Sequence, residues 1–173
     1  MNLQKLATKG VFIFSPKLNY DERGNFAEIY NENTLNQLQV SRFVQQNFVK
    51  SSLNVIRGMH WQSDPFAQAK LITVLKGRIL DVFIDLREKS DTFNEVFSME
   101  LDSSNLESVF IPTGFAHGYQ ALEQDTLISY SVTSKYSPDH EKRINPLSKK
   151  FKRFWKEPYL IGELDLHSVY QDD

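Results

Sequence analysis

Residues 70–86 read KLITVLKGRILDVFIDL, two apolar and β-branched runs on either side of Lys76-Gly77. Such runs favour β-strands, and because glycine tolerates the positive φ of a tight turn, we expect a hairpin here. Similar runs recur along the chain between clusters of Gly, Pro, Asn and Asp. The expected strands span residues 11–14, 26–30, 42–48, 55–62, 70–75, 78–86, 95–101, 108–111, 117–122 and 126–133. Strands spaced this evenly predict an all-β sandwich or barrel.

Helical and basic segments are a minor part of the pattern. Residues 33–40 place Leu35 and Leu38 on one side, which predicts a short helix. The stretch 149–156 is basic with interleaved aromatic residues. We expect the aromatic side chains to dock on the β domain while the lysines stay in solvent, since the rest of the chain is slightly acidic. The candidates for docking are Phe151, Phe154 and Trp155.

The overall composition limits the class of protein. A length of 173 residues, with 40% hydrophobic and 24% charged residues, predicts one folded domain over residues 1–173. The formal net charge of -2 provides no overall positive field for nucleic acid, and the absence of cysteine excludes disulfides and thiol chemistry. The N-terminal residues lack the apolar core of a signal peptide, and no apolar stretch is long enough for a membrane span. We therefore expect a cytoplasmic protein with no membrane or nucleic-acid partner.

Two histidines stand where their side chains could meet. Because strand side chains alternate between faces, His60 and Gln62 share one face of their expected strand. His117 follows a Pro112-Thr113-Gly114 turn, where a strand would re-enter the barrel. We expect the two histidines to converge from separate strands.

Polar side chains also interrupt strands that are otherwise apolar. Lys70 and Asp81 are each embedded in such a strand. Burying an unpaired charge is costly, so the two residues imply an ion pair, a functional cavity, or both. Tyr130 adds a phenolic acid to the set. A base, a cation, a carboxylate and a phenol together suit proton transfer at carbon without a metal.

The two histidine segments resemble those of the cupin superfamily. Metal-binding cupins carry a His-x-His pair followed by a Glu, with a later His behind a Pro-x-Gly turn. Here Gln62 stands in place of the second histidine and no carboxylate follows at the ligand spacing. Two nitrogen ligands then remain where a catalytic metal usually takes three protein ligands, so we expect no metal. The resemblance implies a cupin-type jelly-roll β-barrel or sandwich with a few short helices.

A series of ordered segments supports a more specific match over about residues 21–141. The segments are 21–28 DERGNFAE, 45–47 QQN, 56–62 IRGMHWQ, 70–71 KL, 81–82 DV, 85–87 DLR, 90–93 SDTF, 111–118 IPTGFAHG and 136–138 YSP. They resemble the dTDP-4-dehydrorhamnose 3,5-epimerase family of nucleotide-sugar enzymes. The resemblance implies metal-independent epimerisation at C3, C5 or both of a nucleotide-linked 4-keto-6-deoxyhexose, in deoxysugar and polysaccharide biosynthesis. It also implies a homodimer that needs no cofactor.

The same resemblance implies a role for each matching residue. His60 matches the general base, and Tyr130 matches the acid that protonates the opposite face of the sugar. Lys70 and His117 match sugar contacts, with Lys70 suited to stabilise the enolate oxygen. Asp81 matches a residue beside the catalytic histidine. The positions that match further substrate and nucleotide contacts are Arg23, Phe26, Glu28, Gln45, Asn47, Arg57, Tyr136 and Glu141.

Two places depart from a simple match. A strict pleat puts Arg57 and His60 on opposite faces, so we expect a bulge at Gly58 or an Arg57 that serves a neighbouring site. Family members end with a Ser-x-Lys-Asp segment whose aspartate partners the catalytic histidine. In this chain the gap is shorter and Leu164 stands where the lysine would be, which makes Asp165 a weak candidate for that partner.

Other functions stay open at this point. A cupin 3,4-ketoisomerase would move the carbonyl instead of inverting a centre, although Tyr130 at the acid position favours an epimerase. A non-catalytic nucleotide-sugar-binding cupin would keep the pocket without the chemistry, although the presence of both His60 and Tyr130 argues against it. A metal-dependent dioxygenase is the most distant alternative. The sequence leaves open the nucleotide, the final sugar and the number of inverted centres.

Overall fold

The computed structural model describes residues 2–5, 10–104 and 106–168, and β-strands are their main secondary structure. The strands are β1 (Asn2–Lys5), β2 (Phe12–Ser15), β3 (Leu18–Asp21), β4 (Gly24–Ala27), β5 (Gln45–Ser51), β6 (Val55–Gln62), β7 (Lys70–Lys76), β8 (Arg78–Asp85), β9 (Val96–Asp102), β10 (Ser108–Ile111), β11 (Phe115–Ala121), β12 (Thr126–Val132), β13 (Glu141–Arg143) and β14 (Leu160–Ile161). The helices are α1 (Glu32–Gln37) and α2 (Glu163–Leu166), with 3-10 turns η1 (Pro138–His140) and η2 (Lys152–Phe154). The all-β prediction is confirmed. The prediction of one domain over residues 1–173 extends beyond the described residues and stays a prediction.

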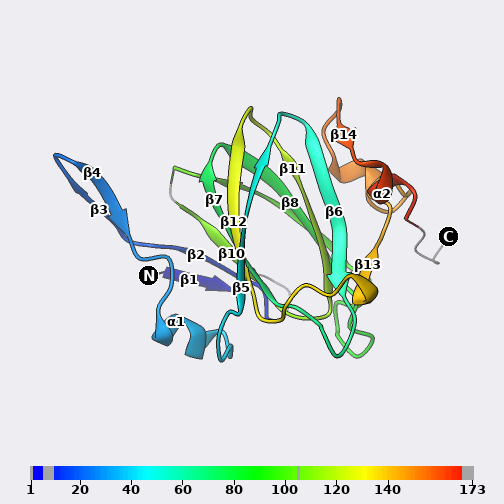
Figure 1. Ribbon diagram of the computed structural model, residues 1–173, viewed down its shortest axis with the longest axis horizontal. Helices are drawn as coiled ribbons and strands as arrows, with labels where there is room; N and C mark the ends of the chain where they lie inside the picture. Colours follow the sequence, from blue (N-terminus) through cyan, green and yellow to red (C-terminus); the bar gives the residue numbers. More distant parts are fainter. Residues whose placement is uncertain (1, 6–9, 105, 169–173) are drawn as a thin grey trace.

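Two sheets face each other as a sandwich (Figure 1). The first sheet has the strand order β1-β2-β10-β7-β12-β5. The second has the order β13-β6-β11-β8-β9, and β14 pairs with β6 in parallel. A separate hairpin of β3 and β4 extends away from the sandwich on the left of Figure 1. Strands that are distant in sequence are therefore neighbours, which is how the histidines of β6 and β11 come together.

The turn at Lys76-Gly77 connects the two sheets and is not a hairpin, so that prediction was wrong. β7 pairs with β10 and β12 in the first sheet, whereas β8 pairs with β9 and β11 in the second. Both strands are buried along most of their length, and each is covered by the opposite sheet. Gly77 does have the expected positive φ, +79°, and a Cβ there would lie 2.7 Å from the Thr126 hydroxyl oxygen.

Apolar side chains fill the space between the sheets. Ile72 and Val74 of β7 belong to the same buried cluster as Ile79 and Phe83 of β8, and all four are 1% exposed or less. Burying a side chain of this size stabilises the fold by about 1.5–3 kcal/mol. This core joins the two sheets, because its members come from strands of both.

The chain after β12 covers the outer face of the second sheet. Phe151 and Trp155 are buried there with Ile144, against Ile56 of β6 and Val82 of β8. The predicted docking of the basic aromatic stretch is thus confirmed. Its lysines and its arginine are exposed or partly exposed. This wrapping brings the last described helix, α2, back to β6.

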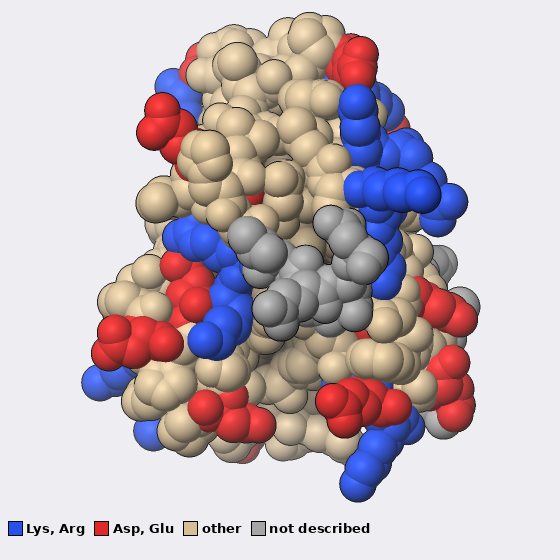
Figure 2. Space-filling view, turned by 90° about the vertical axis from the view of Figure 1, so that its right-hand side faces the viewer, with Lys and Arg blue, Asp and Glu red and all other residues tan. Residues whose placement is uncertain are grey.

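Figure 2 shows the side of the molecule that carries β14 and α2. Basic and acidic side chains both occur on this face, so it has no single sign of charge. Among the described helices, none is long and apolar enough to cross a membrane.

The N-terminal region differs from the predictions in detail. Helix α1 covers Glu32–Gln37 and ends before the predicted boundary, because Leu38 and Val40 leave the helix to pack into a separate cluster. The strand expected over 26–30 lies earlier, as β4, and its partner β3 was not predicted. Both strands of this hairpin are largely exposed, so they lack the apolar alternation that identifies a strand.

Candidate active site

A cavity of about 650 Å³ lies between the two sheets. Its walls come from β6 and β11 of one sheet, β7 and β12 of the other, and β13 and α2 near the mouth. The predicted residues on its walls are Arg57, His60, Lys70, His117, Tyr130, Tyr136, Glu141 and Asp165. The structure therefore brings most of the predicted site together.

A bulge in β6 places Arg57 and His60 on the same side of the strand. His60 pairs with His117 and Arg57 pairs with Tyr119, so three steps along β6 oppose two along β11. Gly58 lies inside the bulge with a φ of +120°. A Cβ on Gly58 would lie only 2.4 Å from a backbone carbon of β11, so only glycine fits here. Of the two expectations for Arg57, the bulge is confirmed.

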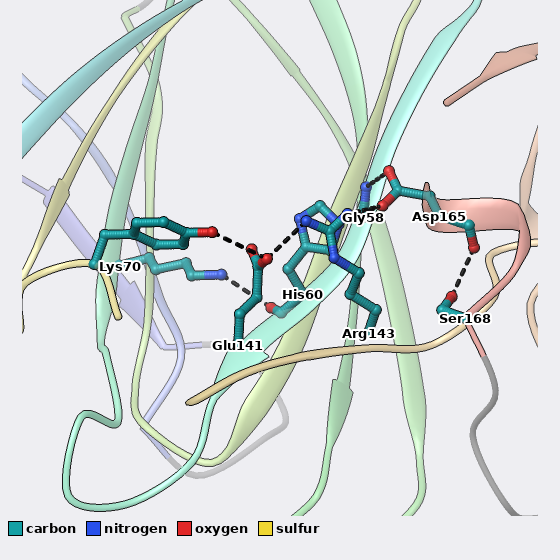
Figure 3. A network of polar contacts seen from close by, with 8 residues as sticks. Gly58, His60, Lys70, Glu141, Arg143, Asp165 and Ser168 are labelled. Atoms are coloured by element: carbon teal, nitrogen blue, oxygen red, sulfur yellow. Dashed lines mark hydrogen bonds and ion pairs between the residues drawn. The ribbon is translucent and has the colours of Figure 1, made fainter. Parts of the chain in front are cut away.

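His60 is held by a carboxylate from the end of the chain. Its Nε2 lies 2.7 Å from Oδ1 of Asp165, and the other oxygen of Asp165 accepts from the Gly58 backbone N–H at 3.3 Å (Figure 3). Burial raises the pKa of Asp165, but the hydrogen bonds from His60, Gly58 and Arg143 lower it more, so this pKa lies below its usual value. An ionised carboxylate only accepts, so Nε2 carries the hydrogen and Nδ1 keeps the free lone pair. The weak candidate Asp165 is thus the partner of His60.

His117 has its own carboxylate partner, Asp81, at 2.6 Å from its Nε2. Asp81 is fully buried, and its second oxygen has no hydrogen-bond partner among the described residues. We expected Asp81 beside the catalytic histidine, His60, and the structure corrects this. Asp81 lies on β8, which is adjacent to β11, whereas β6 is one strand further away.

Lys70 reaches the same cavity from the opposite sheet. Its ammonium group donates a hydrogen bond to the backbone oxygen of His60 at 2.9 Å (Figure 3). Burial lowers the pKa of Lys70 to about 8, although the negative charges of Glu141 and Asp81 oppose this shift. Lys70 therefore stays mostly protonated at neutral pH, and it is a better proton donor than a lysine in solvent.

Tyr130 faces the cavity from β12, the strand next to β7. Burial raises the pKa of Tyr130 above its usual value, despite the opposing charge of Arg57. The phenol consequently keeps its proton at neutral pH. No hydrogen bond joins its hydroxyl to another residue of the described chain. His60 and Tyr130 thus lie in opposite sheets with the cavity between them.

Tyr136 and Glu141 line the cavity beside His60. The Tyr136 hydroxyl donates to Glu141 Oε2 at 3.2 Å, and the same oxygen accepts from Arg143 Nη2 at 2.6 Å. The predicted contacts Gln45 and Asn47 lie on β5, the strand next to β12, and are not part of the cavity wall. The Gln45 side chain donates a hydrogen bond to the Asn47 side chain at 2.9 Å. Gln45 also accepts from the Tyr136 backbone N–H at 3.1 Å, so it supports that residue.

The predicted contacts Arg23, Phe26 and Glu28 are far from the cavity wall. Arg23 pairs with Asp21 on the exposed β3–β4 hairpin, and Phe26 is 70% exposed. Figure 1 shows this hairpin on the side of the sandwich opposite α2. The structure does not bring these three residues to the site of their own chain.

Sequence reasoning missed Arg143. Its Nη1 donates to Asp165 at 2.6 Å and lies 3.3 Å from His60 Nε2. Arg143 follows Glu141 by two residues on β13, so strand alternation from Glu141 would have placed it on the same face. That signal was lost because the three-residue strand β13 was not predicted.

The groups on the cavity wall are suited to proton transfer with charge stabilisation. Among the described residues, no group of three or more His, Asp or Glu side chains is placed to hold a metal ion. Each of the two histidines on the cavity wall instead has a carboxylate behind it, and a lysine and a phenol stand opposite. Such a set removes a proton, stabilises the resulting anion and returns a proton.

Comparison with known proteins gives consistent matches. A sequence model of the dTDP-4-dehydrorhamnose 3,5-epimerase family matches residues 5–170. The dTDP-4-dehydrorhamnose 3,5-epimerase of Methanothermobacter thermautotrophicus is 41% identical over 142 residues, covering 81% of this chain and 76% of that relative.

Solved structures agree with the sequence match. The dTDP-6-deoxy-D-glucose-3,5-epimerase RmlC from Legionella pneumophila, in complex with dTDP-4-keto-L-rhamnose, is 33% identical with a TM-score of 0.90, covering 96% of this chain and 90% of that one. ChmJ, a 3'-monoepimerase from Streptomyces bikiniensis in complex with dTDP-quinovose, is 26% identical with a TM-score of 0.87, covering 94% of this chain and 84% of that one. The expected cupin-type β-fold is confirmed.

Proposed function

The chain belongs to the dTDP-4-dehydrorhamnose 3,5-epimerase family and is an isomerase, and from this premise we propose its substrate and mechanism. The proposed substrate is a dTDP-linked 4-keto-6-deoxyhexose, and the proposed reaction inverts C3, C5 or both without a metal or redox cofactor. One observation carries the proposal: His60 and Tyr130 face a single cavity from opposite sheets. Inversion requires a base and an acid on opposite faces of the same carbon.

His60 starts the reaction as the general base. Its Nδ1 takes the proton from the carbon next to the C4 ketone, while Asp165 stabilises the positive imidazolium that forms. The electron pair of the broken C–H bond moves toward the ketone and leaves negative charge on its oxygen. The step therefore depends on groups that stabilise that oxygen.

Lys70 and His117 supply this stabilisation. Lys70 carries a positive charge in a buried position, where its attraction for an enolate oxygen is stronger than in water. His117 lines the same cavity, and the fully buried carboxylate of Asp81, 2.6 Å from its Nε2, fixes the orientation of the ring. Lys70 and His117 approach the cavity from different sheets and so leave room for the oxygen between them.

Tyr130 completes the inversion from the other face. Its hydroxyl donates a proton to the enolate carbon, forming the new C–H bond. The resulting tyrosinate takes a proton from water, and His60 gives its proton up to water. The raised pKa of Tyr130 keeps this proton in place until the carbon accepts it. Because C3 and C5 both flank C4, rotation of the sugar would let the same pair act at either centre.

The nucleotide is proposed to bind at the mouth of the cavity. Arg57 offers a guanidinium suited to a diphosphate oxygen, and Tyr136 offers an exposed ring for stacking on the base. Gln45, Asn47 and Glu141 are proposed as further contacts in this region.

The hairpin residues fit this scheme in a homodimer. Arg23, Phe26 and Glu28 would then contact the substrate bound by the other copy, since the hairpin extends away from its own cavity. Light scattering should give twice the chain mass, and Arg23→Ala should raise KM more than it lowers kcat. A monomer with full activity would contradict the homodimer.

The experiment that tests the function is proton NMR of the protein with dTDP-4-keto-6-deoxyglucose in D2O. Loss of both the C3 and the C5 proton signals is the expected result for a 3,5-epimerase. Movement of the carbonyl would instead indicate a ketoisomerase. No exchange, with dTDP still bound, would contradict the catalytic proposal and favour a binding protein.

A mono-epimerase is the second candidate. The fold similarity to a 3'-monoepimerase is nearly as high as that to the 3,5-epimerase, so the fold is compatible with either. Loss of the C3 signal alone, with the C5 signal intact, would establish this second candidate.

A further inference from the structure

Arg143 joins two carboxylates at the mouth of the cavity. It lies on β13 directly opposite His60 in the strand register. One guanidinium nitrogen donates to Asp165 Oδ1 and the other to Glu141 Oε2, each at 2.6 Å (Figure 3). The residue therefore ties α2 at the end of the described chain to the strand pair that carries the base.

His60 and Arg143 share one oxygen atom. Asp165 Oδ1 is 2.7 Å from His60 Nε2 and 2.6 Å from Arg143 Nη1, while the two nitrogens are 3.3 Å apart. Arginine only donates, and an ionised carboxylate only accepts. His60 Nε2 and Arg143 Nη1 are thus close together because both donate to the same oxygen of Asp165. This arrangement leaves the hydrogen on Nε2 and the lone pair on Nδ1 of His60.

The position of Arg143 also has an electrostatic consequence. Its positive charge lies beside the imidazole and disfavours a second positive charge on it, and it draws on the same carboxylate oxygen that would stabilise an imidazolium. Burial works against the charge on Arg143, but Glu141 and Asp165 more than compensate and raise its pKa, so the guanidinium is always charged.

We propose that Arg143 is a positioning residue that fixes Asp165 against His60 and lowers the proton affinity of His60. The proposal rests on the proposed function for the role of His60 as the base. Other charged or titratable groups around His60 also contribute to its proton affinity. From the elements packed around the cavity these are Arg57 on β6, Lys70 on β7, Asp81 on β8, His117 on β11, Tyr130 on β12, Tyr136, Glu141 on β13, and Glu163 on α2.

The test compares Arg143→Met with two other variants. Arg143→Met keeps an unbranched apolar stem and removes the charge, and Arg143→Lys restores the charge without the two-pronged contact. Lys142→Met is the matched control, because Lys142 is exposed on the same strand, is not part of the cavity wall and makes the same change in net charge. Thermal unfolding of each variant identifies any loss of folded protein.

Kinetics should separate positioning from simple stability. For Arg143→Met we expect kcat at pH 7 to fall about 10-fold to 100-fold while KM changes much less, because a misplaced base costs about this much. The acid limb of its kcat/KM profile should move up by about one pH unit, since a neighbouring positive charge has been removed. Arg143→Lys should return the limb to the position in the unmodified protein and recover only part of kcat, whereas Lys142→Met should match the unmodified protein in both. An acid limb that stays in place in Arg143→Met would overturn the proposal.

A measurement without substrate keeps this proposal separate from the proposed function. Nitrogen-15 NMR of the free protein, with the His60 signals assigned through His60→Asn, follows the protonation of His60 directly. We expect the His60 titration to move to higher pH in Arg143→Met and to stay in place in Lys142→Met. If that shift occurs but the protein exchanges no sugar protons, the function is wrong and the role of Arg143 stands. If sugar protons exchange but the His60 titration does not move in Arg143→Met, the proposed function stands and the role of Arg143 is wrong.

Discussion

The cavity contains two histidine–carboxylate pairs of different construction. His117 and Asp81 come from adjacent strands inside the second sheet, and their side chains are 9% and 0% exposed. His60 and Asp165 are separated by 105 residues, and their side chains are 27% and 10% exposed. The first pair is built into the sheet, whereas the second depends on the chain returning to β6 at α2.

This difference in construction matches the two proposed tasks. A group that holds an oxyanion must stay fixed, because stabilisation depends on donors that do not need to reorganise. A base must gain and lose a proton in every turnover, which is easier at a partly solvated position. Arg143 contacts only the second of these pairs. We therefore predict that changes to the His60–Asp165 pair mainly affect catalysis, whereas changes to the His117–Asp81 pair also affect stability.

The largest effect is expected from His60→Ala. Removing the base should lower kcat by about 10³-fold, because general base catalysis contributes on this order. Binding of dTDP, measured by calorimetry, should be nearly unchanged, since the nucleotide is proposed to bind at the mouth. Unchanged turnover would exclude His60 as the base.

Asp165→Asn should come next. The amide nitrogen can donate to Nε2, which favours the wrong tautomer, so kcat should fall on the order of 10²-fold. The free energy of unfolding should change less than for Asp81→Asn, because the side chain of Asp165 is 10% exposed whereas that of Asp81 is fully buried. A large loss of stability, measured by urea unfolding, would mean that this pair is as structural as the other.

Asp81→Asn should lower stability more, and kcat less, than Asp165→Asn does. The buried carboxylate would lose its charge-assisted bond to His117, and the free energy of unfolding should fall by about 2 kcal/mol. The loss in kcat should be about 10-fold, smaller than for Asp165→Asn, because Lys70 still stabilises the oxyanion. Equal stability of the two asparagine variants in urea would break the comparison.

Lys70 provides the smallest and most specific test, a pH dependence. Its pKa of about 8 lies below that of a lysine in the unfolded chain, near 10.4, so activity should fall as the pH rises through 8. Between pH 8 and 10.4 the unfolded state binds more protons than the folded state at this site, so this residue makes stability rise with pH there. Lys70→Met should remove both effects, which the kcat profile and urea unfolding would show. An alkaline limb that persists in this variant would assign it to another group.

Much of the fold follows from local sequence patterns. Strands β6 and β10 begin and end where the apolar runs predicted, because each lies inside a sheet with a partner strand on both sides. The patterns failed at β3, β13 and β14, which are short or exposed and lack an apolar alternation. They also failed at the Lys76-Gly77 turn, since a local signal for a turn does not show which sheet the chain enters next.

The site was predictable where its residues interrupt apolar strands or match known motifs. His60, Lys70, His117 and Tyr130 are of this kind, and all four line the cavity. The pairing of carboxylates with histidines was not predictable, because it depends on which strands are neighbours. Asp81 was expected near His60, and Asp165 was only a weak candidate, although the fold gives each a different histidine.

The most direct test of the account is carbon-bound proton exchange in D2O by Tyr130→Phe, compared with His60→Ala. If base and acid act from opposite faces, Tyr130→Phe should still exchange the sugar proton, since His60 forms the enolate, but should yield no inverted product. His60→Ala should neither exchange nor invert. Inversion at the normal rate by Tyr130→Phe would contradict the account, because the acid on the opposite wall would then be some other group.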